Sequence, residues 1–306
     1  MVELSTTGLP KAPAFMRGVA YFMNIFNLLG LLLLAALWGA SFIFMRFAVP
    51  VLGPVLLIEL RVLLAGLALL LLSIRLNLLA QIRQQLIPLF VVGCINSAIP
   101  FLLFALAALS LPAGFSAILN ATAPLFGTII ASLWLREKLT SSRFCGLILG
   151  FAGVTVLVGW TNIPITLSFV GATTAALTAA SICAIAALYA RQKLSGVSPV
   201  VIATGSLLSA AIVLLPITPF FLPTTFPSVT LMLVVLALAL FSTAFAHILY
   251  FYLISNIGAG NALTVAYLVP LFAMLWGAIG LKEPITMTMI LGCSFILTGT
   301  AIAVYK

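Results

Sequence analysis

The chain has 306 residues, of which 64% are hydrophobic and only 6% are charged. A soluble domain carries about a quarter of its residues as charged side chains, because a water-facing surface must enclose its core. The 13 Lys and Arg and 4 Asp and Glu of this chain cannot supply such a surface. The composition therefore excludes a soluble protein and predicts an integral membrane protein.

Continuous apolar runs identify helices as the membrane-spanning elements. In the hydrocarbon layer every backbone N–H and C=O must be satisfied within the protein, which leaves helices or closed barrels. A barrel strand alternates apolar and polar side chains over about ten residues, whereas residues 28–47 and 231–253 are apolar almost throughout. With about 20 residues per crossing, we predict an all-α protein with ten transmembrane helices. They are expected at residues 28–49, 54–74, 86–109, 112–135, 143–160, 168–190, 198–216, 229–254, 259–281 and 286–305.

The first helix follows a short tail, residues 1–26, which we expect to be cytoplasmic. A signal peptide has an apolar region of about 7 to 15 residues. The apolar run that begins near residue 28 is longer. We therefore interpret it as a transmembrane helix that the mature chain retains.

The basic residues predict the orientation of the helices, because Lys and Arg in short loops stay on the cytoplasmic side. With the N-terminus inside, most basic side chains are cytoplasmic, whereas Arg46 and Lys282 face the other side and Arg61 lies within the second helix. The cytoplasmic set is Lys11, Arg17, Arg75, Arg83, Arg136, Lys138, Arg143, Arg191, Lys193 and Lys306. The net charge of +9 thus reflects topology and lipid headgroups rather than nucleic-acid binding. We expect a bacterial inner (plasma) membrane, with both termini cytoplasmic.

An internal repeat divides the chain into two halves, residues 27–160 and 167–306. A shift of 146 positions places Ala113 and Gly114 on Ala259 and Gly260, and Pro124 on Pro270. Further matches join Leu125 to Leu271, Phe126 to Phe272, Leu135 to Leu281, Glu137 to Glu283, Thr140 to Thr286, Gly146 to Gly292 and Gly153 to Gly299. Each half holds five helices, an odd number, so the second half is predicted to be inverted in the membrane. Inverted repeats are typical of secondary transporters.

Several segments resemble the drug/metabolite transporter superfamily, in its EamA-type ten-helix branch. They are Leu-Trp-Gly-Ala-Ser at residues 37–41, Arg61 with Leu-Leu-Ala-Gly at 63–66, the segment 124–137, and Tyr-Phe at 250–251 through 283. The resemblance covers almost the whole chain. It implies a bundle of two inverted five-helix repeats around a central cavity, with the fifth and tenth helices to the side. It also implies export or exchange of small metabolites such as amino acids.

Polar side chains within the predicted helices are candidates for the cavity, because polar groups are costly in lipid. The only histidine, His247, lies on one helix face with Thr243 and Tyr250. Its repeat mate is Phe101, and relatives commonly have an aromatic residue at this position. The imidazole either makes a packing hydrogen bond or faces the cavity as a substrate ligand or proton acceptor.

The fourth helix carries a polar stripe, Ser116 and Asn120, that ends at Pro124. Proline leaves the carbonyl four residues before it without a donor, and Pro270 repeats this arrangement beside Tyr267. Both prolines are interpreted as hinges or as cavity lining, with a simple packing kink as the alternative. The remaining candidates for the cavity lining are Trp38, Asn96, Ser97 and Phe104.

The second helix contains a carboxylate and a guanidinium, Glu59 and Arg61, about 200° apart around the axis, so they cannot both face one cavity. We interpret Arg61 as a structural charge near the outer end of its helix, and expect Glu59 to pair with neighbours of Arg61 or with Arg46. The alternative makes Glu59 a proton-coupling group. Glu137 and Glu283 each close a helix, as an interfacial salt bridge or as a cap for the next helix.

The sequence thus predicts a secondary transporter that works by alternating access. The cargo is a small neutral, zwitterionic or cationic metabolite such as an amino acid or amine, exported or exchanged, with protons as a possible coupling partner. Import is the alternative direction, and a channel is a less favoured class. An enzyme is not expected, because the membrane holds one carboxylate and one histidine. The four separate cysteines show no metal-ligand spacing, so we predict no metal and no cofactor, in a monomer or homodimer.

Overall fold

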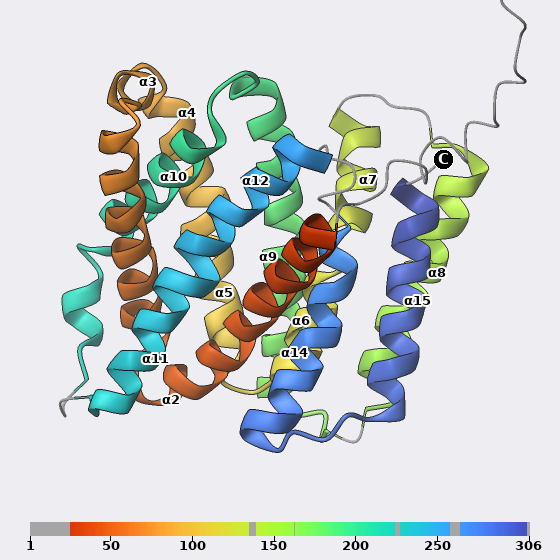
Figure 1. Ribbon diagram of the computed structural model, residues 1–306. Coiled ribbons are helices and arrows are strands. Elements are labelled where there is room, and N and C mark those ends of the chain that lie inside the picture. Colours follow the sequence, from red (N-terminus) through yellow and green to blue (C-terminus); the bar gives the residue numbers. More distant parts are fainter. Residues whose placement is uncertain (1–24, 135–138, 162, 224–226, 258–263, 305–306) are drawn as a thin grey trace, which may run out of the picture.

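A computed structural model describes residues 25–134, 139–161, 163–223, 227–257 and 264–304, and the regular elements of these residues are helices (Figure 1). The first half contributes α2 (Ile25–Arg75), α3 (Leu79–Gln84), α4 (Leu86–Val92), the π-helix η1 (Gly93–Ala98), α5 (Ile99–Ala107), α6 (Ala113–Asn120), α7 (Ala123–Trp134) and α8 (Ser141–Gly159). The second half contributes α9 (Leu167–Lys193), α10 (Pro199–Leu214), the 3₁₀ turn η2 (Thr218–Phe221), α11 (Val229–Ala239), the π-helix η3 (Leu240–Phe245), α12 (Ala246–Ile257), α14 (Val265–Leu281) and α15 (Met287–Val304).

The long helix α2 consists of two arms that meet at Gly53. Its backbone is non-helical there, with φ of 71° and ψ of 161°. A positive φ is costly for residues that carry a Cβ, whereas glycine adopts it freely. Pro54 then starts the second arm, where its missing N–H costs little. The two arms correspond to the predicted helices 28–49 and 54–74.

The described residues include seven helical stretches that are long and apolar enough to cross a membrane. They are Ile25–Arg75, Leu86–Ala107, Ala113–Trp134, Ser141–Gly159, Leu167–Lys193, Val229–Tyr250 and Met287–Val304. The apolar helices α10 and α14 are shorter, with 16 and 17 residues. With two arms in α2, a total of ten crossings requires α10 and α14 to span the bilayer as well, near the lower limit of about 17 residues.

The helices of the two halves interleave. The first arm of α2 packs against α14, and α9, its counterpart in the second half, packs against α6 and α7. The contact between α2 and α14 is close, because a Cβ on Gly39 would lie 2.8 Å from Phe272 Cβ and 2.9 Å from the backbone N of Ala273. Neither half could therefore bury its inner face without the other.

The helices α8 and α15 form a separate pair at one edge of the bundle, where they run in opposite directions (Figure 1). Glycines bring their backbones together: a Cβ on Gly146 would lie 2.6 Å from Ala303 N and Gly299 O, and one on Gly153 would lie 2.8 Å from Ile296 N. Gly146 and Gly153 are the repeat mates of Gly292 and Gly299. This antiparallel pair shows both the inversion of the repeats and the expected position of the fifth and tenth helices.

Apart from Glu59 and Arg61, the charged residues that the structure describes lie near the ends of helices or of the arms of α2, and large apolar side chains cover the flanks of the bundle. The elements α3 and the start of α8 lie at one end, and the Gly53 turn and the α14–α15 connection lie at the other (Figure 1). Leu71, Ile87 and Leu167 are among the exposed apolar side chains. Such an apolar surface fits a lipid environment and makes the protein an integral membrane protein.

Candidate substrate cavity

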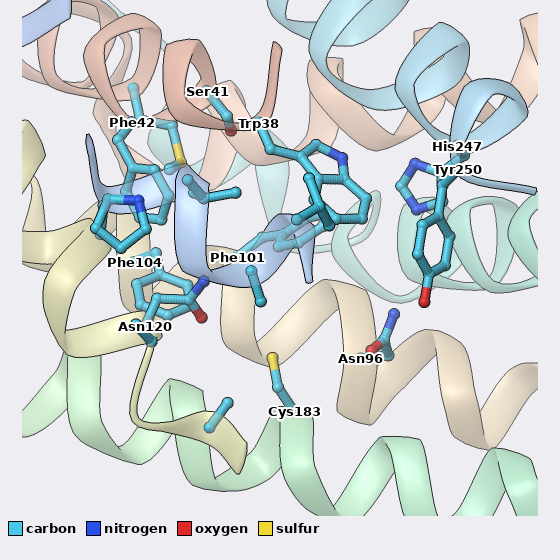
Figure 2. A pocket seen from close by; sticks show the side chains of 18 of the residues that line it. Trp38, Ser41, Phe42, Asn96, Phe101, Phe104, Asn120, Cys183, His247 and Tyr250 are labelled. Carbon is cyan, nitrogen blue, oxygen red and sulfur yellow. The ribbon is translucent and has the colours of Figure 1, made fainter. Parts of the chain in front are cut away.

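A cavity of about 470 Å³ lies between helices of both halves. Its volume falls within the range of about 300 to 1,000 Å³ that is usual for small-molecule sites. The side chains around it are mostly apolar and aromatic (Figure 2). Its lining consists of Trp38, Ser41, Phe42, Met45, Arg61, Asn96, Phe101, Phe104, Ala117, Asn120, Ala121, Ala123, Pro124, Cys183, Ile202, Ala203, Ser206, His247, Tyr250, Val265, Ala266, Val269 and Pro270.

One wall of the cavity is an aromatic cluster from α2 and α12. The ring centroid of Trp38 lies 5.2 Å from that of Tyr250 and 6.4 Å from that of His247. Asn96, from η1, points toward the hydroxyl of Tyr250 across the cavity (Figure 2). This wall offers aromatic faces together with an amide, a phenol and an imidazole, which could bind an apolar group with a polar end.

A second wall is formed by Phe42 and Phe104, whose rings meet edge to face at 5.9 Å. The amide of Asn120 lies beside Phe104, and the thiol of Cys183 points into the cavity between the two walls (Figure 2). Asn120 ends α6, and Pro124 follows at the start of α7. Because Pro124 has no N–H, it cannot donate to the Asn120 carbonyl.

Two π-helices occupy matching positions in the two halves and flank the cavity. Shifted by 146 residues, η1 (Gly93–Ala98) falls within one residue of η3 (Leu240–Phe245). Each interrupts an apolar helix at mid-length, and π-bulges occur frequently at functional sites. In η3 the hydroxyl of Thr243 donates to Leu238 O at 2.9 Å.

His247 is the second residue of α12, the α-helix that follows η3. Its Nδ1 lies 2.6 Å from the carbonyl oxygen of Thr243. A carbonyl can only accept, so Nδ1 carries the proton, and in a neutral ring Nε2 is then the acceptor nitrogen. The hydrogen bond fixes the ring orientation while the ring itself lines the cavity, so the packing and cavity interpretations of His247 both describe part of its environment.

Arg61 lines the cavity, which corrects its interpretation as a structural charge near a helix end. Its side chain is only 5% exposed. Nε donates to Thr243 Oγ1 at 3.0 Å, Nη1 contacts Met45 Sδ at 3.4 Å, and Cζ lies 4.0 Å from the centroid of the Phe101 ring. The second arm of α2 thus carries a cation into the centre of the bundle.

Glu59 is buried on another side of the same arm and is not part of the lining. Its carboxylate is 3% exposed, and neither oxygen has a hydrogen-bond partner among the described residues. The expected pairing of Glu59 with Arg46 was wrong, because Arg46 pairs with Glu283. The expectation that Glu59 and Arg61 face different directions is confirmed.

Arg46 and Glu283 join three segments at the end of the bundle that holds the Gly53 turn (Figure 1); we call this group the Arg46–Glu283 cluster. Arg46 Nε lies 3.5 Å from Glu283 Oε1, and Nη1 donates to the carbonyls of Ala108 and Leu109. Ala113 N–H donates to Glu283 Oε2 at 2.9 Å. Burial raises the pKa of Glu283, although Ala113 and Arg46 oppose the shift. Its repeat mate Glu137 lies outside the described residues.

The structure brings six of the ten predicted contact residues into the lining, together with both prolines: Trp38, Asn96, Phe104, Asn120, His247, Tyr250, Pro124 and Pro270. Ser97, Ser116, Thr243 and Tyr267 are not among the lining residues, which corrects their prediction.

Helix geometry explains these four corrections. The lining face of α6 runs through Ala117, Asn120 and Ala121, beside Ser116. The lining face of α14 passes through Ala266, so Tyr267 is turned by about 100° from it. Ser97 and Thr243 lie in the π-helices, where the α-helical spacing that predicted their direction does not hold.

The prediction missed several lining residues, among them Phe101, Ser41, Cys183 and Ser206. Phe101 had a usable signal, because it is the repeat mate of His247. Cys183 had none, since a single cysteine in an apolar helix resembles any packing residue. Among the described residues, no group of three or more His, Cys, Asp and Glu side chains could hold a metal ion.

Two oppositely oriented copies of one helical unit, enclosing a cavity of metabolite size within an apolar shell, define a membrane transporter. The family model described as the EamA-like transporter family matches residues 25–159 and again residues 171–305. The second match begins 146 residues after the first, the same shift that relates the two halves. The chain belongs to the EamA-like transporter family.

Similar proteins carry the same general description. An "uncharacterized transporter" of Archaeoglobus fulgidus is 26% identical over 280 residues, 90% of this chain and 98% of that protein. From Bacillus subtilis, YvbV is 28% identical over 87% of each chain, and YoaV is 22% identical over 89% of this chain and 94% of its own; both are named uncharacterized transporters. A crystal structure with 19% identity matches the fold with a TM-score of 0.65, over 90% of this chain and 95% of that chain.

Proposed function

We propose that the protein is a secondary transporter that moves a small organic metabolite through the membrane by alternating access. The observation that carries the proposal is the cavity between the inverted halves, which residues of both halves line. In such a fold the two repeats rock around a central site. The mostly apolar lining favours a compact neutral or zwitterionic solute with an apolar group over a multiply charged one.

Transport is favoured over catalysis because the cavity lacks paired acid and base groups. Its lining contains no carboxylate among the described residues, whereas general acid–base catalysis requires positioned proton donors and acceptors. The relatives that match the whole chain are also named transporters.

The test is solute flux in proteoliposomes. Purified protein is first screened by thermal shift against amino acids, amines and nucleosides, and each stabilising solute is then followed as a radiolabelled substrate. A carrier gives saturable flux at slow turnover and no unitary currents in planar bilayers. Unitary currents would identify a channel and contradict alternating access. Flux equal to that of empty liposomes for every stabilising solute would contradict transport.

The proposal also covers the direction of transport and its coupling to protons. We infer export or exchange with both termini in the cytoplasm, supported by the basic residues Arg75, Arg83, Arg143, Arg191 and Lys193; import is the alternative. His247 and Glu59 are the candidate proton-coupling groups. Flux with and without a pH gradient tests this: coupling requires stimulation by the gradient in the wild type and its loss in His247→Gln or Glu59→Gln. Equal flux under both conditions would exclude coupling.

A further inference from the structure

Arg61 is a fixed cation in the cavity, and the described residues provide no counterion for it. Among the described residues no carboxylate lies within salt-bridge distance of its guanidinium, and the ion pair that they contain joins Arg46 to Glu283. A buried charge is expensive unless it is paired and hydrogen-bonded. A cation at this position therefore calls for an anionic partner that the described part of the chain does not supply.

The hydrogen bonds of Arg61 leave donors available. A guanidinium has five N–H groups. One binds Thr243 Oγ1 and another contacts the sulfur of Met45, a weak acceptor. Both N–H groups of Nη2 have no acceptor among the described residues, and Arg61 belongs to the cavity lining. Donors of the planar fork are thus available at the cavity.

The orientation of the guanidinium is fixed from two sides. Thr243 holds Nε from η3, and Phe101, just after η1, stacks under Cζ at 4.0 Å. Both halves of the chain therefore contribute to its position. A fork that is already oriented loses less conformational entropy when it binds a ligand.

We propose that Arg61 binds a single carboxylate on the transported molecule, and that the aromatic wall of Trp38 and Tyr250 receives the apolar part of the same molecule. This assignment rests on the proposed transport function and narrows its substrate class to small monocarboxylates, including zwitterionic amino acids. A carboxylate matches the guanidinium fork with two parallel hydrogen bonds. Arg61 is the only Lys or Arg among the described lining residues, so a phosphate dianion would remain undercompensated. The positive charge of Arg61 also disfavours simple amines, which the sequence alone had retained as candidate substrates.

The test compares ligands that differ only in the carboxylate. Wild-type protein in detergent is titrated with an L-amino acid series that includes L-phenylalanine, L-tryptophan and L-leucine. Each acid is paired with its amide, and phenylethylamine and 3-phenylpropionate complete the panel. We expect at least one carboxylate ligand to raise the unfolding temperature and its amide to have no effect. Binding of the amides or amines with equal affinity, or no stabilisation by any carboxylate, would overturn the assignment.

Variants of Arg61 give the second arm of the test. Arg61→Gln should raise the Kd of the stabilising carboxylate by roughly 10- to 100-fold, and Arg61→Lys should restore part of the affinity because it keeps the charge without the fork. Arg83→Gln, an exposed arginine in α3, is the matched control and should bind as the wild type does. If Arg61→Gln does not fold, the acid and amide comparison in the wild type still decides.

The outcomes separate this assignment from the proposed function. Saturable flux of an amine or nucleoside that is unchanged in Arg61→Gln would remove Arg61 as a carboxylate site and leave transport intact. Binding of a carboxylate that depends on Arg61 without any flux in proteoliposomes would support the site and contradict transport.

Discussion

Trp38 of α2 lies in the cavity wall, where its ring contacts two residues of α12 in the other half of the chain. Its indole ring packs against the rings of Tyr250 and His247. Ring contacts of this kind do not select a ligand by the positions of hydrogen-bonding groups. Aromatic faces of this kind bind many apolar groups by dispersion and quadrupole interactions. At the scale of the residue, we therefore expect Trp38 to contribute affinity for the apolar part of a solute and its polar neighbours to orient the solute.

We expect Trp38→Ala to weaken binding of the stabilising solute by about tenfold, because an aromatic contact contributes about 0.5 to 1.5 kcal/mol beyond the area it buries. The measurement is a Kd from thermal-shift titration. Trp160→Ala is the control, since Trp160 caps α8 and is 69% exposed. Equal losses in the two variants would show that the effect is not specific to the cavity.

The predicted polar residues of η3 and α12 show which side-chain directions the sequence could predict and which it could not. His247 and Tyr250 both line the cavity, because they lie in regular α-helix, where residues three apart share a face. Thr243 lies in η3, where the chain takes more residues per turn, and its side chain binds Arg61 instead of facing the cavity. Neither the spacing nor the composition of residues 240–245 marks a π-helix. The sequence also did not predict that the Arg61 side chain enters the cavity, because its partners lie in segments that are far away in sequence.

At the scale of the element, η3 joins the cavity to the second arm of α2. The hydroxyl of Thr243 donates to Leu238 O and accepts from Arg61 Nε. One side chain thus satisfies a carbonyl within the π-helix and orients the guanidinium. The helix distortion and the position of the charge depend on each other.

Thr243→Val should lower both stability and ligand affinity, because it leaves a buried N–H of Arg61 without an acceptor, at a cost of about 1 to 3 kcal/mol. Thr243→Ser keeps the hydroxyl and should retain most of both properties. Unfolding temperature and Kd are measured for the two variants together. A valine variant as stable as the serine variant would show that the hydrogen bond to Arg61 contributes nothing.

The pair α8–α15 depends on glycine in a way that can be measured. Gly153→Ala would place a methyl group 2.8 Å from the backbone N of Ile296, so we expect a loss of about 1 to 3 kcal/mol from overpacking. Gly171→Ala in α9 is the matched control, because no atom of the described residues outside the adjacent helix backbone lies within 4 Å of its ideal Cβ. The control should be neutral or more stable, since alanine favours helix. Unfolding in detergent followed by tryptophan fluorescence compares the two, and a Gly153→Ala variant as stable as the wild type would contradict the close packing.

At the scale of the whole molecule, the positions of most helices could be predicted because hydrophobic length and proline placement report them directly. The break between α6 and α7 lies at Ala121, just before the predicted kink at Pro124. The inversion followed from the odd number of helices in each repeat. The contact between Arg46 and Glu283 could not be predicted, because the two residues lie far apart in sequence and the pairing depends on how α2 and α14 approach each other.

Because the two halves are inverted, we expect two residues that are repeat mates to be exposed on opposite sides of the membrane. Leu139 precedes α8 and Ile285 precedes α15; both are exposed, and they are repeat mates. Single cysteines at these positions, in a chain with the four native cysteines replaced by alanine, should react with a membrane-impermeant maleimide from opposite sides of sealed vesicles. Labelling of both from the same side would contradict the inverted arrangement and the alternating access that we propose.

The contacts of the Arg46–Glu283 cluster predict that loss of the Glu283 carboxylate opens the cavity toward that end of the bundle. Glu283→Ala leaves Arg46 and the Ala113 N–H without their partner, so labelling of Cys183 from that side should increase several-fold when the other native cysteines are replaced. Burial raises the pKa of Glu283 above its ordinary value, so the carboxyl binds its proton more tightly in the folded protein than in the unfolded chain. The stability that the raised pKa contributes to the folded protein is present at low pH, and it is lost as the pH rises through that pKa.

Glu283→Gln is neutral and keeps an oxygen that can accept from Ala113, so it should remain as closed as the wild type. Lys282→Gln removes an exposed charge at the same end and serves as a second control. Equal labelling of Cys183 in the alanine and wild-type proteins would show that the cluster does not close the cavity.

The antiparallel crossing of α8 and α15 has a consequence for how the chain can be divided. A gene split within residues 160–166 would yield two fragments, each ending in a helix whose glycine groove is left open. Because each groove is complementary to the other, co-expressed fragments should recognise one another and rebuild the complete carrier without a covalent link. Either fragment alone would present its groove to a second copy of itself, an arrangement from which a duplicated and fused gene could have originated.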